Sequence, residues 1–272
     1  KASAQKILTA LNQPYILGSY EAYSTPSIGV TLFQGNPQSV QDLLKCADLA
    51  MYQAKAAGRN TVCFFDPSMQ AAAAARSALE GDIRLGIQRK EFLLHYQPVV
   101  NDVGQVLGAE ALVRWSHPVR AMVSPAHFIP LAEQTGLILL LGRQVLTMAC
   151  DKLAHWAQSP ATAAWSLAVN VSAVEFRQPD FVPQVLAILR DSGANPDRLK
   201  IELTESMLLN DVEASILKMH DLRSQGVCFS LDDFGTGYSS LTYLKRLPLH
   251  QLKIDQSFVR DVLTDPNDAT IA

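Results

Sequence analysis

The sequence predicts an α/β protein whose larger part is a barrel of mostly parallel strands with helices outside. From Phe92 onward, strand-like and helix-like segments alternate, which is typical of repeated strand–helix–strand units. Asn170, Glu202 and Asp232 each stand near the C-terminal end of a predicted strand, where barrel enzymes gather their functional groups. The chain has no G-x-G-x-x-G turn, which an open dinucleotide-binding sheet would show. These observations favour the barrel over a doubly wound sheet.

The beginning of the chain predicts a separate and smaller α/β piece. It contains a strand at Ser27–Leu32, an amphipathic helix at Val40–Ala57 capped by Gly58, and a strand at Val62–Phe65. Such a unit cannot bury its own faces, so we expect it to be the end of a larger domain. The alanine-rich Ser68–Arg89 segment predicts a linking helix. The expected domains are therefore residues 1–67, a linker at 68–91, and the barrel domain at 92–272.

Within the barrel domain, apolar periodicity of two predicts strands and periodicity of 3.6 predicts helices. The expected strands are Leu93–Val100, Leu107–Trp115, Ser166–Ser172, Leu199–Thr204, Cys228–Asp232 and Gln251–Asp255. The expected helices are Pro130–Ala157, Phe181–Asp191, Asp211–Ser224 and a short one at Tyr238–Leu247.

Composition limits the class of protein. The 272 residues are 48% apolar and 18% charged, which indicates a well-cored globule. A net charge of -3 gives no reason to expect a nucleic-acid polymer as partner. Four cysteines without a Cys-x-x-Cys pair indicate reduced thiols in a cytoplasmic protein. The most apolar run, Leu137–Leu141, is far shorter than a membrane span, so any membrane anchor would lie outside this sequence.

Three strand-like stretches end in acids: Lys200–Glu205, Ser230–Asp233 and Leu252–Asp255. Because strand side chains alternate between two faces, their polar residues are expected to share one pocket. That pocket would hold the polar residues Glu202, Asp232, Asp233 and Lys253.

The expected pocket has the chemistry of a two-metal site. Its candidate ligands are all oxygen donors, and hard oxygen donors select Mg²⁺ or Mn²⁺ over Zn²⁺. Two ions held by adjacent aspartates could clamp an in-line displacement at phosphorus, which predicts phosphodiester hydrolysis. Lys253 could orient an attacking water. Arg114, on the same strand face as Glu110, could form two parallel hydrogen bonds with a phosphate. The candidate ligands are Glu110, Asn170, Glu202, Asp232 and Asp233.

Structural explanations compete with each of these assignments. A single glutamate on an apolar strand is more often a salt-bridge partner than a metal ligand, and a strand lysine such as Lys253 is usually solvated. Asp233 alone could cap the helix that follows it. Convergence of several acids at equivalent strand ends favours the metal site, since clustered negative charge without cations would be costly.

The chain resembles the EAL domain of bacterial cyclic di-GMP phosphodiesterases over about residues 92–272. The shared motifs include Glu110-Ala111-Leu112-Val113-Arg114-Trp115, Asn170-Val171-Ser172, Glu202-Leu203-Thr204-Glu205, Asp232-Asp233-Phe234-Gly235 and Lys253-Ile254-Asp255. The residues before position 67, including Ala47-Asp48-Leu49-Ala50-Met51-Tyr52, resemble the second half of a GGDEF (diguanylate cyclase) domain without its signature motif. The parent protein is then expected to be a GGDEF–EAL tandem.

The EAL resemblance implies a TIM-like (β/α)8 barrel whose first strand is antiparallel, with two divalent ions and cyclic di-GMP as substrate. It implies that Glu110, Asn170, Glu202 and Asp232 hold one ion, and that Asp232 and Asp233 serve the other. Lys253 would hold the nucleophilic water, and Glu205 would brace the loop at residues 234–240, which in the family couples metal binding to dimerisation. A homodimer is therefore expected. The dinucleotide contacts implied are Gln97, Leu112, Arg114 and Asp255.

The chain stops at Ala272, before the family's Glu-Gly-Val-Glu stretch and its last two strand–helix units, so we expect it to be part of a longer protein. The glutamate of that stretch is the family's general base and a further ligand. Two alternatives to hydrolysis of cyclic di-GMP to linear pGpG stay open. They are a non-catalytic cyclic di-GMP receptor and a dimerisation scaffold. Retention of Glu110, Asp232, Asp233 and Lys253 favours the enzyme.

Overall fold

The computed structural model describes residues 2–33, 39–208, 211–235 and 244–261, and these form two compact units, 1–81 and 82–272. None of the described helices has the length and apolarity needed to cross a bilayer. The predicted helix at Tyr238–Leu247 lies mostly outside the described residues.

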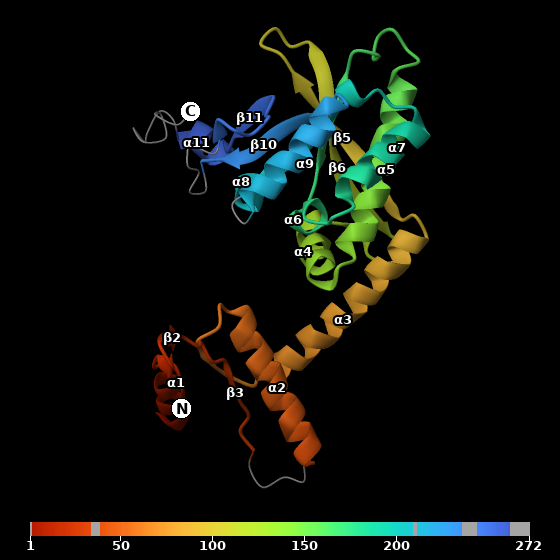
Figure 1. The fold of residues 1–272 in the computed structure, drawn as a ribbon. Coiled ribbons are helices and arrows are strands. Elements are labelled where there is room, and N and C mark those ends of the chain that lie inside the picture. The colour runs from red at the N-terminus through yellow and green to blue at the C-terminus, as the bar shows by residue number, and fades with distance from the viewer. Residues whose placement is uncertain (1, 34–38, 209–210, 236–243, 262–272) are drawn as a thin grey trace. The chain divides into compact units, whose positions relative to one another are not determined.

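The first unit contains a small parallel pair of strands packed against one helix (Figure 1). β3 pairs with β4, and α2 begins at the N-cap Ser39, whose hydroxyl accepts a hydrogen bond from the Asp42 amide. Gly29 of β3 lies directly against α2. Any larger residue at this position would collide with the Ala47 carbonyl. The elements are α1 (Ala2–Leu11), β1 (Tyr15–Leu17), β2 (Tyr20–Ala22), β3 (Ile28–Val30), α2 (Val40–Ala56) and β4 (Val62–Phe64). The sequence did not predict α1, β1 or β2.

Helix α3 (Pro67–Gln88) is continuous, and the boundary between the two units falls inside it. Its C-terminal end packs within the second unit. Gly86 lies so close to Trp115 and Phe92 that an added methyl group would crowd both rings. Asp82 accepts a hydrogen bond from Arg120 at 3.0 Å, which links this end of α3 to the turn that follows β6 (Val106–His117).

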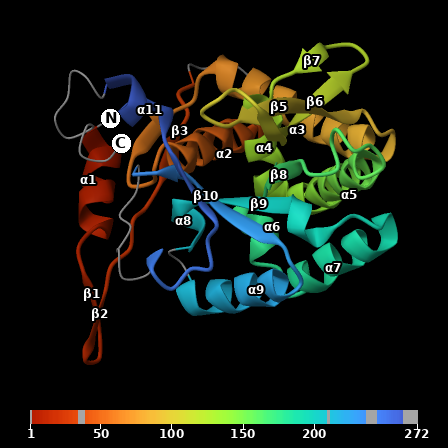
Figure 2. The ribbon, with the colours of Figure 1, turned by 90° about the horizontal axis from the view of Figure 1, so that it is seen from above.

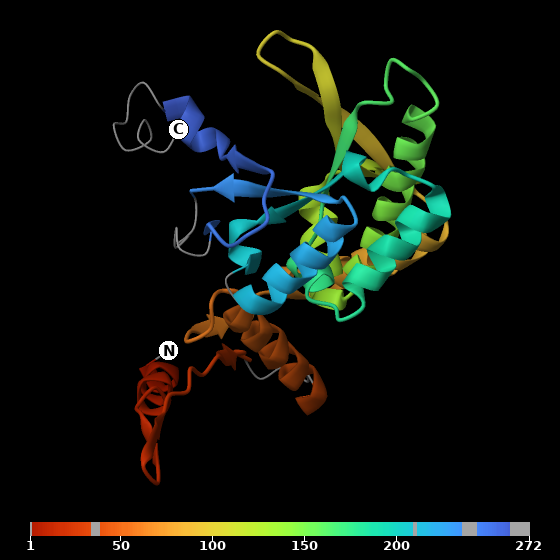
Figure 3. The ribbon, with the colours of Figure 1, turned by 45° about the horizontal axis from the view of Figure 1, so that its top comes forward.

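The second unit is a curved sheet in the order β11-β10-β9-β8-β6-β5, with β7 added beside β6. β5 runs antiparallel to β6, and β6, β8, β9, β10 and β11 run parallel, so β5 and β11 are the two edges among the described residues. Figure 3 shows β11 beside β10 at one edge. The strands are β5 (Phe92–Val100), β6 (Val106–His117), β7 (Ala121–Val123), β8 (Ser166–Asn170), β9 (Leu199–Thr204), β10 (Cys228–Phe234) and β11 (Gln251–Ile254).

Helices α5, α7 and α9 lie side by side along one face of this sheet (Figure 2). The amphipathic sequences of α5 and α7, and the buried Ile216, Met219 and Leu222 of α9, pack against the apolar residues of β8, β9 and β10. The helices are α4 (Pro125–Thr135), α5 (Ile138–Trp156), α6 (Ala173–Phe176), α7 (Phe181–Ser192), α8 (Glu205–Leu208), α9 (Val212–Ser224) and α11 (Gln256–Asp261), with a 3₁₀ turn at Pro196–Arg198.

One predicted helix was wrong, and one strand of the second unit, β7, was not predicted. The helix expected at Pro130–Ala157 is two helices, because Gly136 ends α4 in the left-handed conformation with φ of 75°. Strand β7 was missed, because Ala121 takes the left-handed position of the hairpin turn, with φ of 56°, where a glycine would have signalled the turn.

Candidate active site

The strands of the second unit divide their side chains cleanly between an apolar and a polar face. Residues 167, 169, 199, 201, 203, 229 and 231 are buried and apolar. The residues between them point to the opposite face, because strand side chains alternate. That opposite face carries Ala168, Asn170, Lys200, Glu202, Thr204, Ser230, Asp232, Lys253 and, from β6, Glu110 and Leu112.

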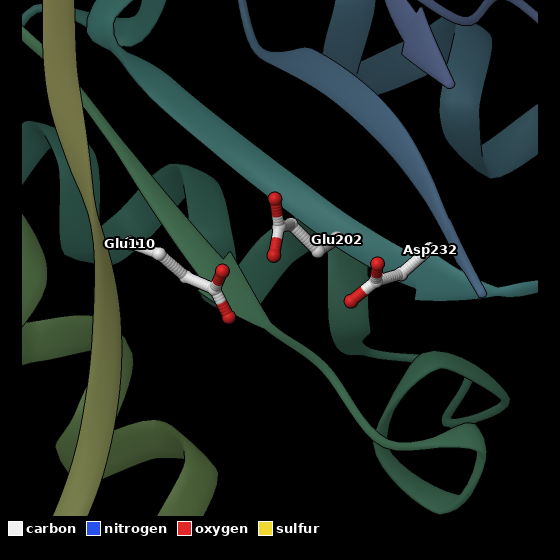
Figure 4. Close-up of side chains that lie close together, drawn as sticks. All are labelled: Glu110, Glu202 and Asp232. Atoms are coloured by element: carbon white, nitrogen blue, oxygen red, sulfur yellow. The ribbon is translucent and has the colours of Figure 1, made fainter. Parts of the chain in front are cut away.

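Three carboxylates from three different strands converge on this polar face. One oxygen from each of Glu110, Glu202 and Asp232 lies within 4.8 Å of the others. Figure 4 shows the three side chains turned toward a common space from β6, β9 and β10. Parallel strands with matched C-terminal ends bring these residues together, although they are far apart in the sequence.

Lys253 of β11 is the cation at the centre of this cluster. Its ammonium nitrogen lies 2.7 Å from Glu202 Oε2, 3.0 Å from Glu110 Oε2 and 3.3 Å from Asp232 Oδ2. Burial disfavours the ammonium, but the hydrogen bonds and charges of Glu202 and Glu110 outweigh burial and raise the pKa of Lys253. Burial also raises the pKa of Glu202 to about 7, against the opposing effect of Lys253.

The amide of Asn170 extends the cluster on the β8 side. Its Nδ2 donates a hydrogen bond of 2.7 Å to Glu110 Oε1, the carboxylate oxygen that Lys253 does not touch. An amide oriented in this way keeps its carbonyl oxygen available as a neutral donor for a cation. The structure therefore brings together four of the five predicted metal ligands.

Asp233 is not a member of the three-carboxylate group found among the described residues. Its backbone is left-handed, with φ of 55°, and its amide donates to Asp232 Oδ1 at 3.1 Å. Partial burial, together with the charges of Asp232 and Asp255, raises the pKa of Asp233. A strained turn at this point is typical of residues held in place for function.

Glu205 lies directly after β9 and is 3% exposed. Its Oε2 accepts a hydrogen bond of 3.3 Å from the Gly235 amide, so it contacts the start of the loop that the sequence predicted it to brace. Its Oε1 is buried and has no hydrogen-bond partner within the part of the chain that is described. The rest of the predicted loop, residues 236–240, lies outside the described residues.

The predicted dinucleotide contacts occupy the rim of the same face. Gln97 pairs with Glu110 across β5 and β6 and is exposed. Leu112 and Arg114 follow Glu110 on its side of β6, and Arg114 is half-buried. Asp255 follows β11, and its carboxylate accepts hydrogen bonds from the amide and hydroxyl of Ser257, which lower its pKa.

Sequence reasoning missed one feature beside this face, a cavity of about 520 Å³. Its lining includes Leu112, Arg114 and Asn170 of the polar face, together with two acids, Glu133 of α4 and Glu175 of α6. Burial raises the pKa of Glu175 to about 7, against hydrogen bonds from Ser172 that lower it, and the charge of Glu133 raises it further. The spacing Ser172-x-x-Glu175 is that of a helix capping box, which was the available sequence signal.

Comparison with known proteins identifies the family. The sequence model of the EAL domain family matches residues 80–272 of this chain. The chain belongs to the EAL domain family. The model of the diguanylate cyclase GGDEF domain matches residues 1–61, so both predicted resemblances are confirmed.

Named relatives of this EAL protein carry matching descriptions. The chain is 42% identical over 98% of its length to the bifunctional diguanylate cyclase/cyclic di-GMP phosphodiesterase MucR of Pseudomonas aeruginosa, covering 39% of that protein. It is 35% identical over 98% of its length to the cyclic di-GMP phosphodiesterase PdeR of Escherichia coli, covering 40% of it. The chain thus spans about two fifths of each of these relatives.

Solved EAL structures confirm the fold class. The PaMucR phosphodiesterase in complex with c-di-GMP superposes with a TM-score of 0.68 at 43% identity, over 71% of this chain and 78% of that one. The EAL enzyme Bd1971, in its cAMP and cyclic-di-GMP bound form, gives a TM-score of 0.68 at 32% identity, over 74% of this chain and 55% of that one. The predicted TIM-like barrel with an antiparallel first strand is consistent with the β5–β6 pairing.

Proposed function

We propose that the EAL domain of this protein hydrolyses one phosphodiester bond of cyclic di-GMP to give linear pGpG, with Mg²⁺ or Mn²⁺. The observation that carries the proposal is the convergence of Glu110, Glu202 and Asp232 around Lys253 on the polar face of the sheet. Relatives named as cyclic di-GMP phosphodiesterases support the substrate class.

The donor set fits a hard divalent ion. Three carboxylates within 4.8 Å and a neighbouring amide supply only oxygen donors, without histidine or cysteine in the group. Glu110, Asn170, Glu202 and Asp232 would hold one ion, and Asp232 with Asp233 would serve a second. When bound, such ions supply positive charge that polarises the phosphoryl group and favours attack at phosphorus.

The chain's own residues would bind and orient the reactants. Lys253 is held as an ammonium by its carboxylate partners, so it can donate hydrogen bonds to a water or to a phosphoryl oxygen but cannot accept a proton. Arg114 on the rim supplies a planar guanidinium for a phosphate of the dinucleotide. Gln97, Leu112 and Asp255 would contact the rest of the substrate, and Glu205 would position the loop beyond Asp233 through the Gly235 amide.

The test is turnover of cyclic di-GMP by the purified full-length protein with Mn²⁺ or Mg²⁺, with products separated by chromatography. Asp232→Asn is expected to remove both Mn²⁺ binding, measured by calorimetry, and turnover. Lys253→Met is expected to lower kcat by about 100-fold or more, because a buried donor aimed at developing charge is lost. Asp191→Asn, an exposed residue of α7, is the matched control and is expected to change neither.

A protein that binds cyclic di-GMP with metal present yet leaves it intact would contradict hydrolysis and favour the receptor alternative. Normal turnover by Asp232→Asn would contradict the site assignment alone.

We further propose that the protein acts in the bacterial cytoplasm as a homodimer. Sedimentation of the purified protein tests the dimer.

A further inference from the structure

The C-terminal end of β6 carries two adjacent side chains that point to opposite faces of the sheet. Arg114 is on the polar face with Glu110, and Trp115 is on the other face, where it packs against Phe128 of α4. The Arg114 guanidinium donates a hydrogen bond of 2.8 Å to the carbonyl of its neighbour Val113. Within the described part of the chain it has no other hydrogen bond and no ion pair. The position of the guanidinium therefore follows that of the β6 backbone.

Trp115 is fully buried and is held from several sides. Its ring stacks on Phe92 of β5 at a centroid distance of 5.1 Å and meets Phe128 edge to face at 5.7 Å. Its indole Nε1 donates a hydrogen bond of 3.1 Å to Glu91 Oε2. The N–H is the single polar group of an indole, so the carboxylate that accepts from it fixes how the buried ring lies.

Glu91 stands between α3 and β5 and joins the helix to the sheet. Its amide donates to the Gly86 carbonyl of α3 at 2.9 Å, and its carbonyl accepts from the Ser116 amide of β6 at 3.0 Å. Gly86 leaves room for this arrangement. A methyl group there would lie 2.9 Å from the Trp115 indole nitrogen and 3.2 Å from Glu91 Oε2. The end of α3 thus packs directly behind the strand segment that carries Arg114.

A second contact fastens the same end of β6 to α3. Besides accepting from Arg120, the Asp82 carboxylate lies 3.4 Å from His117 Nε2. The other ring nitrogen of His117 accepts hydrogen bonds from the Val119 and Arg120 amides. Residues 115–120 are therefore held by α3 on both sides of the strand end, at Glu91 and at Asp82.

We propose that Glu91 and Trp115 are positioning residues for the substrate, because they fix the place of Arg114 at the end of β6. The inference rests on the proposed function, in which Arg114 binds a phosphate of the dinucleotide. Two parallel hydrogen bonds from a guanidinium to a phosphate require close alignment, so a small displacement of Arg114 lowers substrate affinity.

The metal ligands are held independently of this contact. Glu202 and Asp232 belong to β9 and β10, and Glu110 of β6 is held by its own hydrogen bonds with Asn170 and Lys253. Loss of the contact behind Arg114 should therefore weaken binding of cyclic di-GMP and leave binding of Mn²⁺ unchanged. A general loss of stability would not separate the two affinities in this way.

The test compares Glu91→Leu with Glu91→Gln in the purified full-length protein. Glutamine keeps an oxygen that can accept from the indole N–H, and leucine has none. Glu91→Leu is expected to raise KM for cyclic di-GMP by about tenfold, with kcat changed by less than about twofold. Glu91→Gln is expected to keep the unmodified KM. Mn²⁺ affinity, measured by calorimetry, should be the same in all three proteins. Gly86→Ala crowds the indole from the α3 side and is expected to raise KM as well.

Two further variants make the comparison secure. Trp115→Phe keeps an aromatic ring but removes the N–H, and it replaces Glu91→Leu if circular dichroism shows that Glu91→Leu does not fold. Val185→Ala removes methyl groups from a buried residue of α7 and should lower stability without raising KM.

The Kd for cyclic di-GMP, measured with Mn²⁺ in the slow Lys253→Met background, tests the same inference without turnover. A Kd that rises with Glu91→Leu in a protein that shows no hydrolysis would support the positioning role and contradict the proposed function. The inference is overturned if Glu91→Leu leaves KM and Kd unchanged, if Glu91→Gln raises them as much, or if Mn²⁺ affinity falls in parallel.

Discussion

Replacement of Glu175 by glutamine is expected to make the protein more stable, and only at neutral and alkaline pH. Burial is the main reason that the pKa of Glu175 rises from 4.5 to about 7. Between pH 4.5 and about pH 7, the Glu175 carboxyl keeps its proton in the folded protein but has lost it in the unfolded chain. The contribution of Glu175 to the free energy of unfolding therefore falls as the pH rises through this window and stays level above about pH 7.

The size of the effect follows from the shift. A change from 4.5 to about 7, at 1.36 kcal/mol for each pH unit, sets an upper bound of about 3.4 kcal/mol on the penalty of the charged form. Relaxation around the carboxylate lowers this bound, so we expect about 1–3 kcal/mol. Glutamine has no charge to bury and keeps the capping hydrogen bond with Ser172. The variant and the unmodified protein should therefore differ least at pH 5, the lowest pH measured, and should differ by the full amount at pH 8.

Urea denaturation at pH 5, 6, 7 and 8, in buffer with a chelator, measures this difference directly. All other titrating groups are common to the two proteins and cancel in the comparison. Asp191→Asn, which removes an exposed carboxylate, is expected to show no pH-dependent difference. A stability difference between Glu175→Gln and the unmodified protein that stays constant from pH 5 to pH 8 would refute the burial argument.

Three further changes test how the sheet and its helices are held. Ala121→Gly is expected to raise the free energy of unfolding by about 0.5–1 kcal/mol, because residue 121 has φ of 56° and glycine adopts this conformation without strain. Gly142→Ala is expected to lower it by about 2 kcal/mol or more, since the new methyl group meets the Glu175 carboxylate. Lys218→Met is expected to lower it by about 1–2 kcal/mol, because the ammonium donates to the Phe176 and Gln178 carbonyls at 2.7 Å each. Urea denaturation at pH 7 checks all three, and unchanged midpoints would contradict each account.

The residues of the candidate site were the easiest part to predict. Glu110, Glu202, Asp232 and Lys253 each interrupt an apolar run on the same face of the sheet, and the parallel pairing sets the four strands in register. Two simple regularities therefore bring four distant residues together. The same reasoning placed Asn170 next to Glu110, where the two side chains are hydrogen-bonded.

Features that depend on a single backbone conformation were not predictable. Gly136 stands inside an apolar sequence compatible with one long helix, and only its left-handed conformation divides α4 from α5. Ala121 and Asp233 take left-handed conformations that non-glycine residues rarely adopt, so no local signal announced them. Glu175 packs against Gly142, a residue of a different helix, and such long-range packing leaves no local pattern.

The central lysine has a consequence for assembly of the protein. Negative groups gathered this closely would push the strand ends apart during folding, yet the ammonium of Lys253 already neutralises part of their charge. A divalent ion at the proposed site would have to compete with this tethered counter-charge, so its apparent affinity would be weaker than the bare acids would give. Occupancy would consequently follow the supply of free ions in the cell, rather than being fixed at synthesis.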